Sequence, residues 1–306
     1  MLFHPPEEIK AEVFSRVPDA LRKPSATSKW AMANRPGHPA DCFLEGPSFD
    51  RDGNLYLVDI PNGRIFRVGP EGDFDTVTEY DGWPNGLKIH TDGRLFVADY
   101  RHGIMVIDPA TGTVEALIDH RWSEGFRGCN DLFFATNGDL YFTDQGQTGM
   151  HDQTGRVYRY SAAGRLECLI HNGPSPNGLV MNPSETILYV AMTRANNVWR
   201  VPILPDATTS KVGVYVQLSG GLAGPDGLCM GSNGELVVAH CGLGSVWVFD
   251  PLGQPLYRVT SPDGVYTTNV AFGGADNRDL YITESDTGTV LRARLPVSGE
   301  LMYGQR

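Results

Sequence analysis

The feature that most constrains the fold is a short apolar sequence motif, called the phrase below, that recurs six times along the chain. Each copy begins with leucine and continues as an apolar or alternating segment, as a buried strand does. Most copies follow a turn signal such as RDGN or TNGD. Successive leucines are 40, 45, 48, 48 and 44 residues apart. The copies are LYLVD from Leu55, LFVAD from Leu95, LYFTD from Leu140, LYVAM from Leu188, LVVAH from Leu236 and LYITE from Leu280.

Further apolar segments flank each phrase. Examples are GRIFRV (63–68) after the first copy and GLKIH (86–90) before the second. Three or four strands in about 45 residues, repeated without helical periodicity, is the pattern of propeller blades. We predict an all-β fold, a six-bladed β-propeller, in which 1–306 form one domain. Residues 1–39 precede the first blade, and we expect part of them to add an outer strand to the last blade, because the ring would otherwise keep an open edge.

The net charge of the chain limits the classes of partner that we expect it to bind. The chain has 25 Lys and Arg against 36 Asp and Glu, a formal net charge of −11, which disfavours nucleic acid and anionic membranes. No apolar run approaches the roughly 20 residues that span a bilayer. The start, MLFHPPEEIKAEVF, lacks the basic and then apolar stretch of a signal peptide. We expect a cytoplasmic protein that binds neither nucleic acid nor membrane; its oligomeric state stays open.

Oxygen-bearing side chains recur ten or eleven residues before each phrase. The innermost strands of a propeller face its channel, so these positions would form a ring around the axis. An alternative is that PNGL (84–87 and 176–179) and PDGL (225–228) are tight turns. That alternative does not explain the other three positions, which are not followed by the same turn dipeptides. The ring positions are Glu45, Asn85, Asn130, Asn177, Asp226 and Asn269.

A ring of oxygen atoms favours a hard cation. Calcium takes 6–8 oxygen ligands, and two carboxylates, Glu45 and Asp226, would balance its charge. Zinc prefers histidine or cysteine, and neither occurs on the ring. We therefore predict a central site for one divalent metal ion, with calcium preferred and zinc, manganese or iron(II) as alternatives.

The longer motifs resemble the senescence marker protein/gluconolactonase/luciferin-regenerating-enzyme family, from about Asp41 to Tyr303. The motifs include LEGPSFDRDGNLYLVDIPNGRIFRV (44–68), PNGLVMNPSETILYVAMT (176–193) and PDGLCMGSNGELVVA (225–239). The resemblance implies a six-bladed propeller with a central divalent cation and hydrolysis of lactones or phosphotriesters. It implies that the metal ligands are Glu45, Asn130, Asn177 and Asp226. It also suggests Arg127 as a substrate-binding residue, although Arg127 lies three residues before Asn130 and some members place this arginine two before.

The predicted reaction is hydrolysis of a cyclic ester, with a sugar lactone such as gluconolactone as substrate. Asp226 is the candidate general base, because a positioned carboxylate can take a proton from water. Asn85, Asn269 and Arg127 are candidate substrate contacts. His240 either contacts substrate near the channel mouth or is structural. The insertion 145–156 could form a lid or a solvated loop.

Two other functions remain open at this point. One is a related hydrolase of an organophosphate or aromatic lactone, and the other is a binding propeller in which the metal is structural. A serine hydrolase is disfavoured because the chain has no GxSxG motif.

Overall fold

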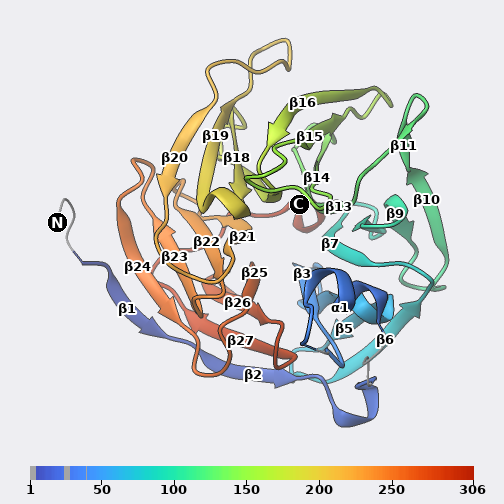
Figure 1. The fold of residues 1–306 in the computed structure, drawn as a ribbon. Coiled ribbons are helices and arrows are strands. Elements are labelled where there is room, and N and C mark those ends of the chain that lie inside the picture. The colour runs from blue at the N-terminus through green and yellow to red at the C-terminus, as the bar shows by residue number, and fades with distance from the viewer. Residues whose placement is uncertain (1–4, 24–27, 39) are drawn as a thin grey trace.

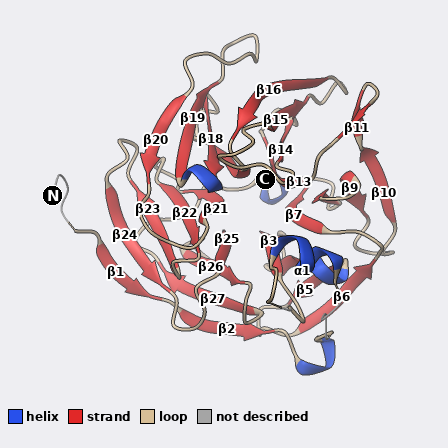
Figure 2. Cartoon of the chain, viewed as in Figure 1, coloured by secondary structure: helices blue, strands red, loops and turns tan. Residues whose placement is uncertain are grey.

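Six sheets are arranged around a central axis in the structure, a computed structural model that describes residues 5–23, 28–38 and 40–306 (Figure 1). This confirms the predicted six-bladed β-propeller. In the residues that the structure describes, helix is confined to α1 (Lys29–Asn34) and four short 3₁₀ turns, and the other described residues form strands and loops (Figure 2). The 3₁₀ turns are η1 (Asp19–Leu21), η2 (Ile60–Asn62), η3 (Thr193–Ala195) and η4 (Tyr303–Gln305). No helix in the described ranges is long and apolar enough to cross a membrane.

Each blade is an antiparallel meander whose first strand is innermost. Blade one contains β3 (Leu44–Phe49), β4 (Leu55–Asp59), β5 (Arg64–Val68) and β6 (Phe74–Glu79). Blade two contains β7 (Pro84–Ile89), β8 (Leu95–Asp99), β9 (Gly103–Ile107) and β10 (Val114–Ile118). Blade three contains β13 (Cys129–Phe134), β14 (Leu140–Asp144), β15 (Gly155–Tyr160) and β16 (Leu166–Gly173). A small hairpin, β11 (His120–Arg121) and β12 (Glu124–Gly125), lies between blades two and three.

The second half of the ring repeats this plan. Blade four contains β17 (Pro176–Met181), β18 (Ile187–Met192), β19 (Asn197–Pro202) and β20 (Gly213–Gln217). Blade five contains β21 (Gly224–Met230), β22 (Leu236–Cys241), β23 (Ser245–Phe249) and β24 (Pro255–Thr260). Blade six contains β25 (Thr267–Gly273), β26 (Asp279–Glu284) and β27 (Thr289–Arg294). Every repeated sequence phrase therefore lies on the second strand of its blade.

Two strands from the start of the chain lie outside the last two blades. Strand β2 (Glu12–Arg16) pairs antiparallel with β27 and supplies the fourth strand of blade six. Strand β1 (Glu7–Lys10) pairs parallel with β24 and adds a fifth strand to blade five. The segment that precedes the first blade, 1–39, also includes residues that lie outside the described ones, namely 1–4, 24–27 and 39. The ring is thus joined by hydrogen bonds between β2, near the start of the chain, and β27, the last strand of blade six.

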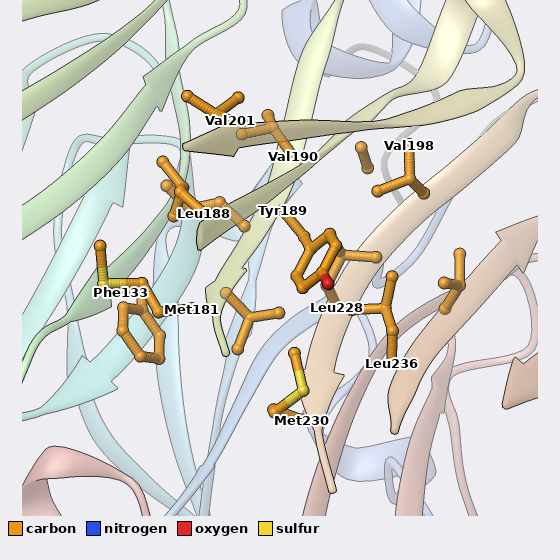
Figure 3. Close-up of a cluster of buried hydrophobic side chains, with 14 of the residues drawn as sticks. Phe133, Met181, Leu188, Tyr189, Val190, Val198, Val201, Leu228, Met230 and Leu236 are labelled. Atoms are coloured by element: carbon orange, nitrogen blue, oxygen red, sulfur yellow. The ribbon is translucent and has the colours of Figure 1, made fainter. Parts of the chain in front are cut away.

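The hydrophobic core lies between neighbouring blades. One cluster combines Phe133 of blade three, Met181 and Tyr189 of blade four, and Leu228 and Leu236 of blade five (Figure 3). Because the blades are stacked radially, this packing fixes the distance of each innermost strand from the axis. Side chains at equivalent positions of these strands are thereby brought close together at the axis.

Four blades bury an acidic residue at the end of the second strand. Each of these carboxylates accepts a hydrogen bond from a backbone N–H group. Asp59 accepts from Phe43 N at 2.8 Å and also pairs with the buried Arg64, whose Nε lies 2.9 Å away. The others are Asp99, Asp144 and Glu284, whose backbone donors lie at 2.7–2.9 Å. These acids organise the turns around their strands.

The last residues, 296–306, cross the end of the channel where the innermost strands finish. Glu300 N donates to Met230 O at 2.8 Å, and the ring of Tyr303 stacks on Phe134 with centroids 5.2 Å apart. A cavity of about 20 Å³ remains between this tail and the strands, space for about one water molecule. The C-terminus accordingly lies near the centre of the ring in Figure 1. We call this side the tail face, and the opposite side, where the innermost strands begin, the open face.

Candidate active site

The six ring positions all lie near the start of an innermost strand, and all six side chains are buried. Their exposed fractions range from 2% for Asn269 to 8% for Asn85 and Asp226. In every blade the ladder between the first and second strands is interrupted at or next to this residue. A bulge of this kind re-aims a side chain, so the sequence repeat and the interruption mark the same place.

The Asn-Gly and Asp-Gly pairs lie within strands and not in tight turns. They belong to β7, β17 and β21. Their glycines allow neighbouring innermost strands to approach closely. A Cβ atom on Gly227 would lie 2.0 Å from Asn269 Oδ1, and one on Gly86 would lie 2.4 Å from Asp131 Oδ1. The tight-turn interpretation of these pairs is therefore wrong.

Glu45 is held in place by two hydrogen bonds to one of its oxygens. Glu45 Oε2 accepts from Gly46 N and from Asn269 Nδ2, each at 2.8 Å. The other end of the Asn269 carboxamide accepts from Val270 N at 2.8 Å. Asn269 therefore has partners at both ends of its carboxamide, and its contact with Glu45 supports a positioning role at the axis.

Three carboxylates share the axis with one ammonium group. Glu45, Asp131 and Asp226 are buried, and Lys88 Nζ lies 3.7 Å from Asp131 Oδ1. Burial raises the pKa of Glu45 to about 7, and the charge of Asp131 adds to this effect. Burial and then the charges of Glu45 and Asp131 raise the pKa of Asp226 well above its usual range. Burial also raises the pKa of Asp131, against the opposing effect of Lys88. The site therefore has three buried carboxyl groups but only one buried ammonium group beside them.

Asn130 presents an oxygen to the ring because its nitrogen is engaged elsewhere. Asn130 Nδ2 donates to Gln145 Oε1 at 2.9 Å, and Gln145 Nε2 donates to Ser175 Oγ at 3.0 Å. Among the described residues no hydrogen bond uses the carboxamide of Asn85 or Asn177, and the side-chain partner of the Asp226 carboxylate is the thiol of Cys241. The carboxamides of Asn85 and Asn177 are thus available to a ligand.

The donor set fits a hard divalent cation. Two carboxylates and two carboxamides supply oxygen atoms, and an added cation would relieve the repulsion that raises the carboxylate pKa values. Within the described part of the chain, no group of three or more His, Cys, Asp or Glu side chains could hold a metal by itself. A cation on the axis would therefore depend on the asparagines as well as the carboxylates.

His240 is engaged at both ring nitrogens. Trp247 Nε1 lies 3.1 Å from His240 Nδ1, and His240 Nε2 lies 3.1 Å from Gly220 O. The side chain is fully buried, and burial lowers its pKa. This arrangement favours the structural alternative for His240, since both ring nitrogens have protein partners.

Arg127 points into the inserted loop. Its guanidinium contacts Thr154 Oγ1 and lies 3.6 Å from Asp152 Oδ2. The same loop contributes to a pocket of about 510 Å³ on the open face. The pocket is lined by residues that include Asn34, Gln145, Gln147, His151, Ser175 and Arg194. Gln145 and Ser175 connect this pocket to Asn130 of the ring.

Three residues of the site are not among those predicted from the sequence. Asp131 directly follows a ring asparagine and was not distinguished from it. Lys88 interrupts the apolar strand GLKIH, where the matching positions of blades four and five hold Val180 and Cys229. That interruption was a usable signal for a buried charge. Gln145 gave no signal, because its role depends on the path of the loop.

Known proteins resemble the chain over most of its length. A family model described as SMP-30/Gluconolactonase/LRE-like region matches residues 43–286. The chain is 30% identical over 288 residues to a gluconolactonase of Zymomonas mobilis, covering 84% of this chain and 80% of that protein. It is 31% identical over 231 residues to the lactonase drp35 of Staphylococcus aureus, covering 72% and 70%.

Among solved structures, a calcium-binding protein, regucalcin, from Agrobacterium tumefaciens superimposes with a TM-score of 0.79 at 22% identity. The match covers 98% of this chain and 99% of that one. At this identity the likeness concerns the fold. The matched family model and the two sequence relatives carry the assignment further, and they agree with the motifs around the ring. The chain belongs to the SMP-30/gluconolactonase/LRE-like family.

Proposed function

We propose that this protein is a divalent-metal-dependent lactonase whose substrate is a sugar lactone. The observation that carries the proposal is the buried ring of oxygen atoms beside an open pocket. Membership of a family with relatives called gluconolactonase and lactonase supports the same reaction. A ring without an adjacent pocket would suit a purely structural ion equally well, so the pocket favours an enzyme over a binding propeller.

Glu45, Asn130, Asn177 and Asp226 would hold the cation. Oxygen ligands of this kind favour calcium, and the structural relative described as a calcium-binding protein supports that choice. Asn269 would orient Glu45 through its 2.8 Å hydrogen bond, and Gln145 would orient Asn130. When bound, the cation would supply Lewis acidity that polarises the lactone carbonyl.

Asp226 would accept a proton from the attacking water. Its carboxylate is buried, and the positive charge of Arg194 partly opposes the increase in its pKa. A bound cation would favour the ionised form of Asp226 and so lower its pKa. Asp226 would then be a weak base, but it would be ionised and ready to accept a proton. Water would add to the carbonyl carbon, the ring C–O bond would break, and the alcohol oxygen would receive a proton.

The remaining polar groups would bind the substrate. Asn85 offers a carboxamide at the axis, and Asn34, Gln147 and Ser175 line the pocket, where hydroxyl groups need both donors and acceptors. Arg127 would act through the inserted loop, since its guanidinium contacts Thr154. The tail would keep bulk solvent from reaching the ring through the tail face.

The test is a hydrolysis assay on protein first freed of metal by chelation. Sugar lactones, an aromatic lactone and a phosphotriester would each be supplied with calcium, zinc, manganese or iron(II). We expect rapid metal-dependent opening of sugar lactones. Preference for the aromatic lactone or phosphotriester would favour the related hydrolase instead. Loss of all hydrolysis, with tight metal binding retained, would leave the binding propeller.

A further inference from the structure

Unlike the other cations at the site, Arg194 has no hydrogen-bond or ion-pair partner among the described residues. Lys88 lies beside Asp131, and Arg127 contacts Thr154 and lies near Asp152. Among the ion pairs and hydrogen bonds of the described residues, none involves the Arg194 guanidinium. Its side chain is exposed and lines the pocket on the open face.

The turn that carries Arg194 is firmly attached to the site. Arg194 belongs to η3, between β18 and β19 of blade four. The preceding residue, Thr193, is buried; its N donates to Ser175 O at 3.0 Å and its Oγ1 to Pro225 O at 2.8 Å. Pro225 directly precedes Asp226. The backbone of Arg194 is therefore fixed relative to both the pocket and the axis.

The stem of Arg194 packs on the inserted loop. A Cβ atom on Gly149 would lie 3.5 Å from Arg194 Cγ and 3.6 Å from its Cβ. These are ordinary van der Waals distances, so the stem of Arg194 lies directly beside the loop at Gly149. Arg194 shares the pocket wall with Gln145 and Ser175. Gln145 Oε1 accepts from Asn130 Nδ2 of the ring, so the pocket wall that carries Arg194 leads directly to the proposed reaction centre.

We propose that Arg194 receives a carboxylate substituent of the substrate, so that the preferred sugar lactones carry a second, free acid group. This inference rests on the proposed function and narrows its substrate class. A guanidinium without a protein partner can offer a carboxylate two parallel hydrogen bonds. In a chain with a formal charge of −11 the overall field repels anions. Recognition of an anionic lactone would therefore have to come from a local cation such as Arg194.

Two ligands that differ only at one carbon provide the test. Glucono-1,4-lactone ends in a neutral CH₂OH group, and glucaro-1,4-lactone has a carboxylate at the same carbon. Calorimetric titration of chelated, metal-free protein would measure binding without hydrolysis, and kcat and KM would then be measured with metal. We expect wild type to favour glucaro-1,4-lactone at least tenfold, in affinity and in kcat/KM.

Arg194→Gln should reduce that preference by about 10- to 100-fold, as loss of a charge-assisted hydrogen bond does. The change should appear in affinity and KM more than in kcat. Arg194→Lys should restore part of it, because lysine keeps the charge but not the paired donors. Arg200→Gln is the matched control: it removes an exposed positive charge from the same blade, on β19, and should leave the preference unchanged.

An equal preference in wild type and Arg194→Gln would overturn the inference, as would a wild type that binds both lactones equally. The proposed function fails separately. If no lactone is hydrolysed with any metal while the binding preference still depends on Arg194, the pocket recognises the anion but the lactonase assignment is wrong. If lactones are hydrolysed without an Arg194-dependent preference, the lactonase assignment stands alone.

Discussion

Two sets of buried carboxylates recur around this ring, and their surroundings differ. Asp59, at the end of a second strand, accepts a backbone N–H and faces the buried Arg64. Glu45 and Asp226, on the axis, face each other's charge and that of Asp131. Burial raises the pKa of Asp59 as it does those of Glu45 and Asp226, but only Asp59 forms an ion pair with a buried arginine among the described residues. Buried carboxyl groups without an ion-pair partner from the protein therefore indicate a site where a cation can bind.

We expect the largest effect on activity from substitution of a carboxylate on the axis. Asp226→Asn keeps an oxygen of similar size but removes a charge and the proposed base. At saturating metal we expect kcat to fall by about 10²- to 10⁴-fold. Asp75→Asn, at an exposed position of blade one, is the control and should behave as wild type. Wild-type kcat in Asp226→Asn would transfer the role of base to another group.

Substitution of an acid at the end of a second strand should lower the free energy of unfolding and leave catalysis unchanged. Asp59→Ala leaves Arg64 buried without its partner, at 2% exposure. Removal of one member of a buried ion pair costs about 3–5 kcal/mol. Denaturant unfolding should show this loss, with kcat unchanged per folded molecule. Asp75→Ala, which breaks the exposed pair with Arg67, should cost less than about 1 kcal/mol. Equal losses in the two variants would contradict the distinction.

Metal removal sharpens the same contrast. A cation bound only by the folded protein stabilises it by about 2.7 kcal/mol at a hundredfold excess over Kd. Chelation should therefore lower Tm, and calcium should restore it. Asp226→Asn should show a smaller calcium-dependent shift than wild type, whereas Asp59→Ala should keep the full shift. An identical Tm for metal-free and calcium-loaded wild type would refute binding at the axis.

The stability of the metal-free protein should depend on pH because the pKa of Glu45 on the axis is raised. The folded-state pKa of Glu45, about 7, exceeds the unfolded value, which is about 4.3. Between these values the folded state holds one more proton, so stability is greatest at the acidic end and falls as pH rises. The slope from this group is about 1.4 kcal/mol per pH unit. Urea unfolding from pH 5 to 7 measures it, and saturating calcium should flatten the curve. A metal-free curve that is flat or rises with pH would contradict this assignment.

The smallest expected effect concerns Asn85. Its side chain is buried at the axis but takes part in no hydrogen bond between described residues. Asn85→Ala should therefore leave the free energy of unfolding within about 1 kcal/mol of the wild-type value. If Asn85 only positions substrate, KM should rise several-fold with kcat nearly unchanged. A large fall in kcat would instead assign Asn85 to the chemical step.

The sequence pattern was sufficient for the fold because each repeated phrase encodes one buried strand. LYLVD coincides with β4 and LFVAD with β8. Strand β1 gave no such signal, since its residues EEIK are mostly polar and exposed. It pairs with β24 through its backbone, which hydrophobic patterning does not report.

The candidate site was predictable only in part, for a related reason. Spacing from the phrases located the ring residues, because bulges recur at the same point of every blade. Arg194 could not be found in this way. Its importance depends on which arginines have partners, and contacts such as that of Arg127 with Thr154 exist only in the folded loop.

The pairing of β2 with β27 has a consequence for how the protein is made. During synthesis the closing strand emerges before any blade, but its partner, Thr289–Arg294, emerges after nearly all of the chain. Glu45 and Asp226 therefore leave the ribosome well before the ring that brings them together can be sealed. A chain released before residue 289 would carry every proposed metal ligand and still lack the closed circle that holds them in register.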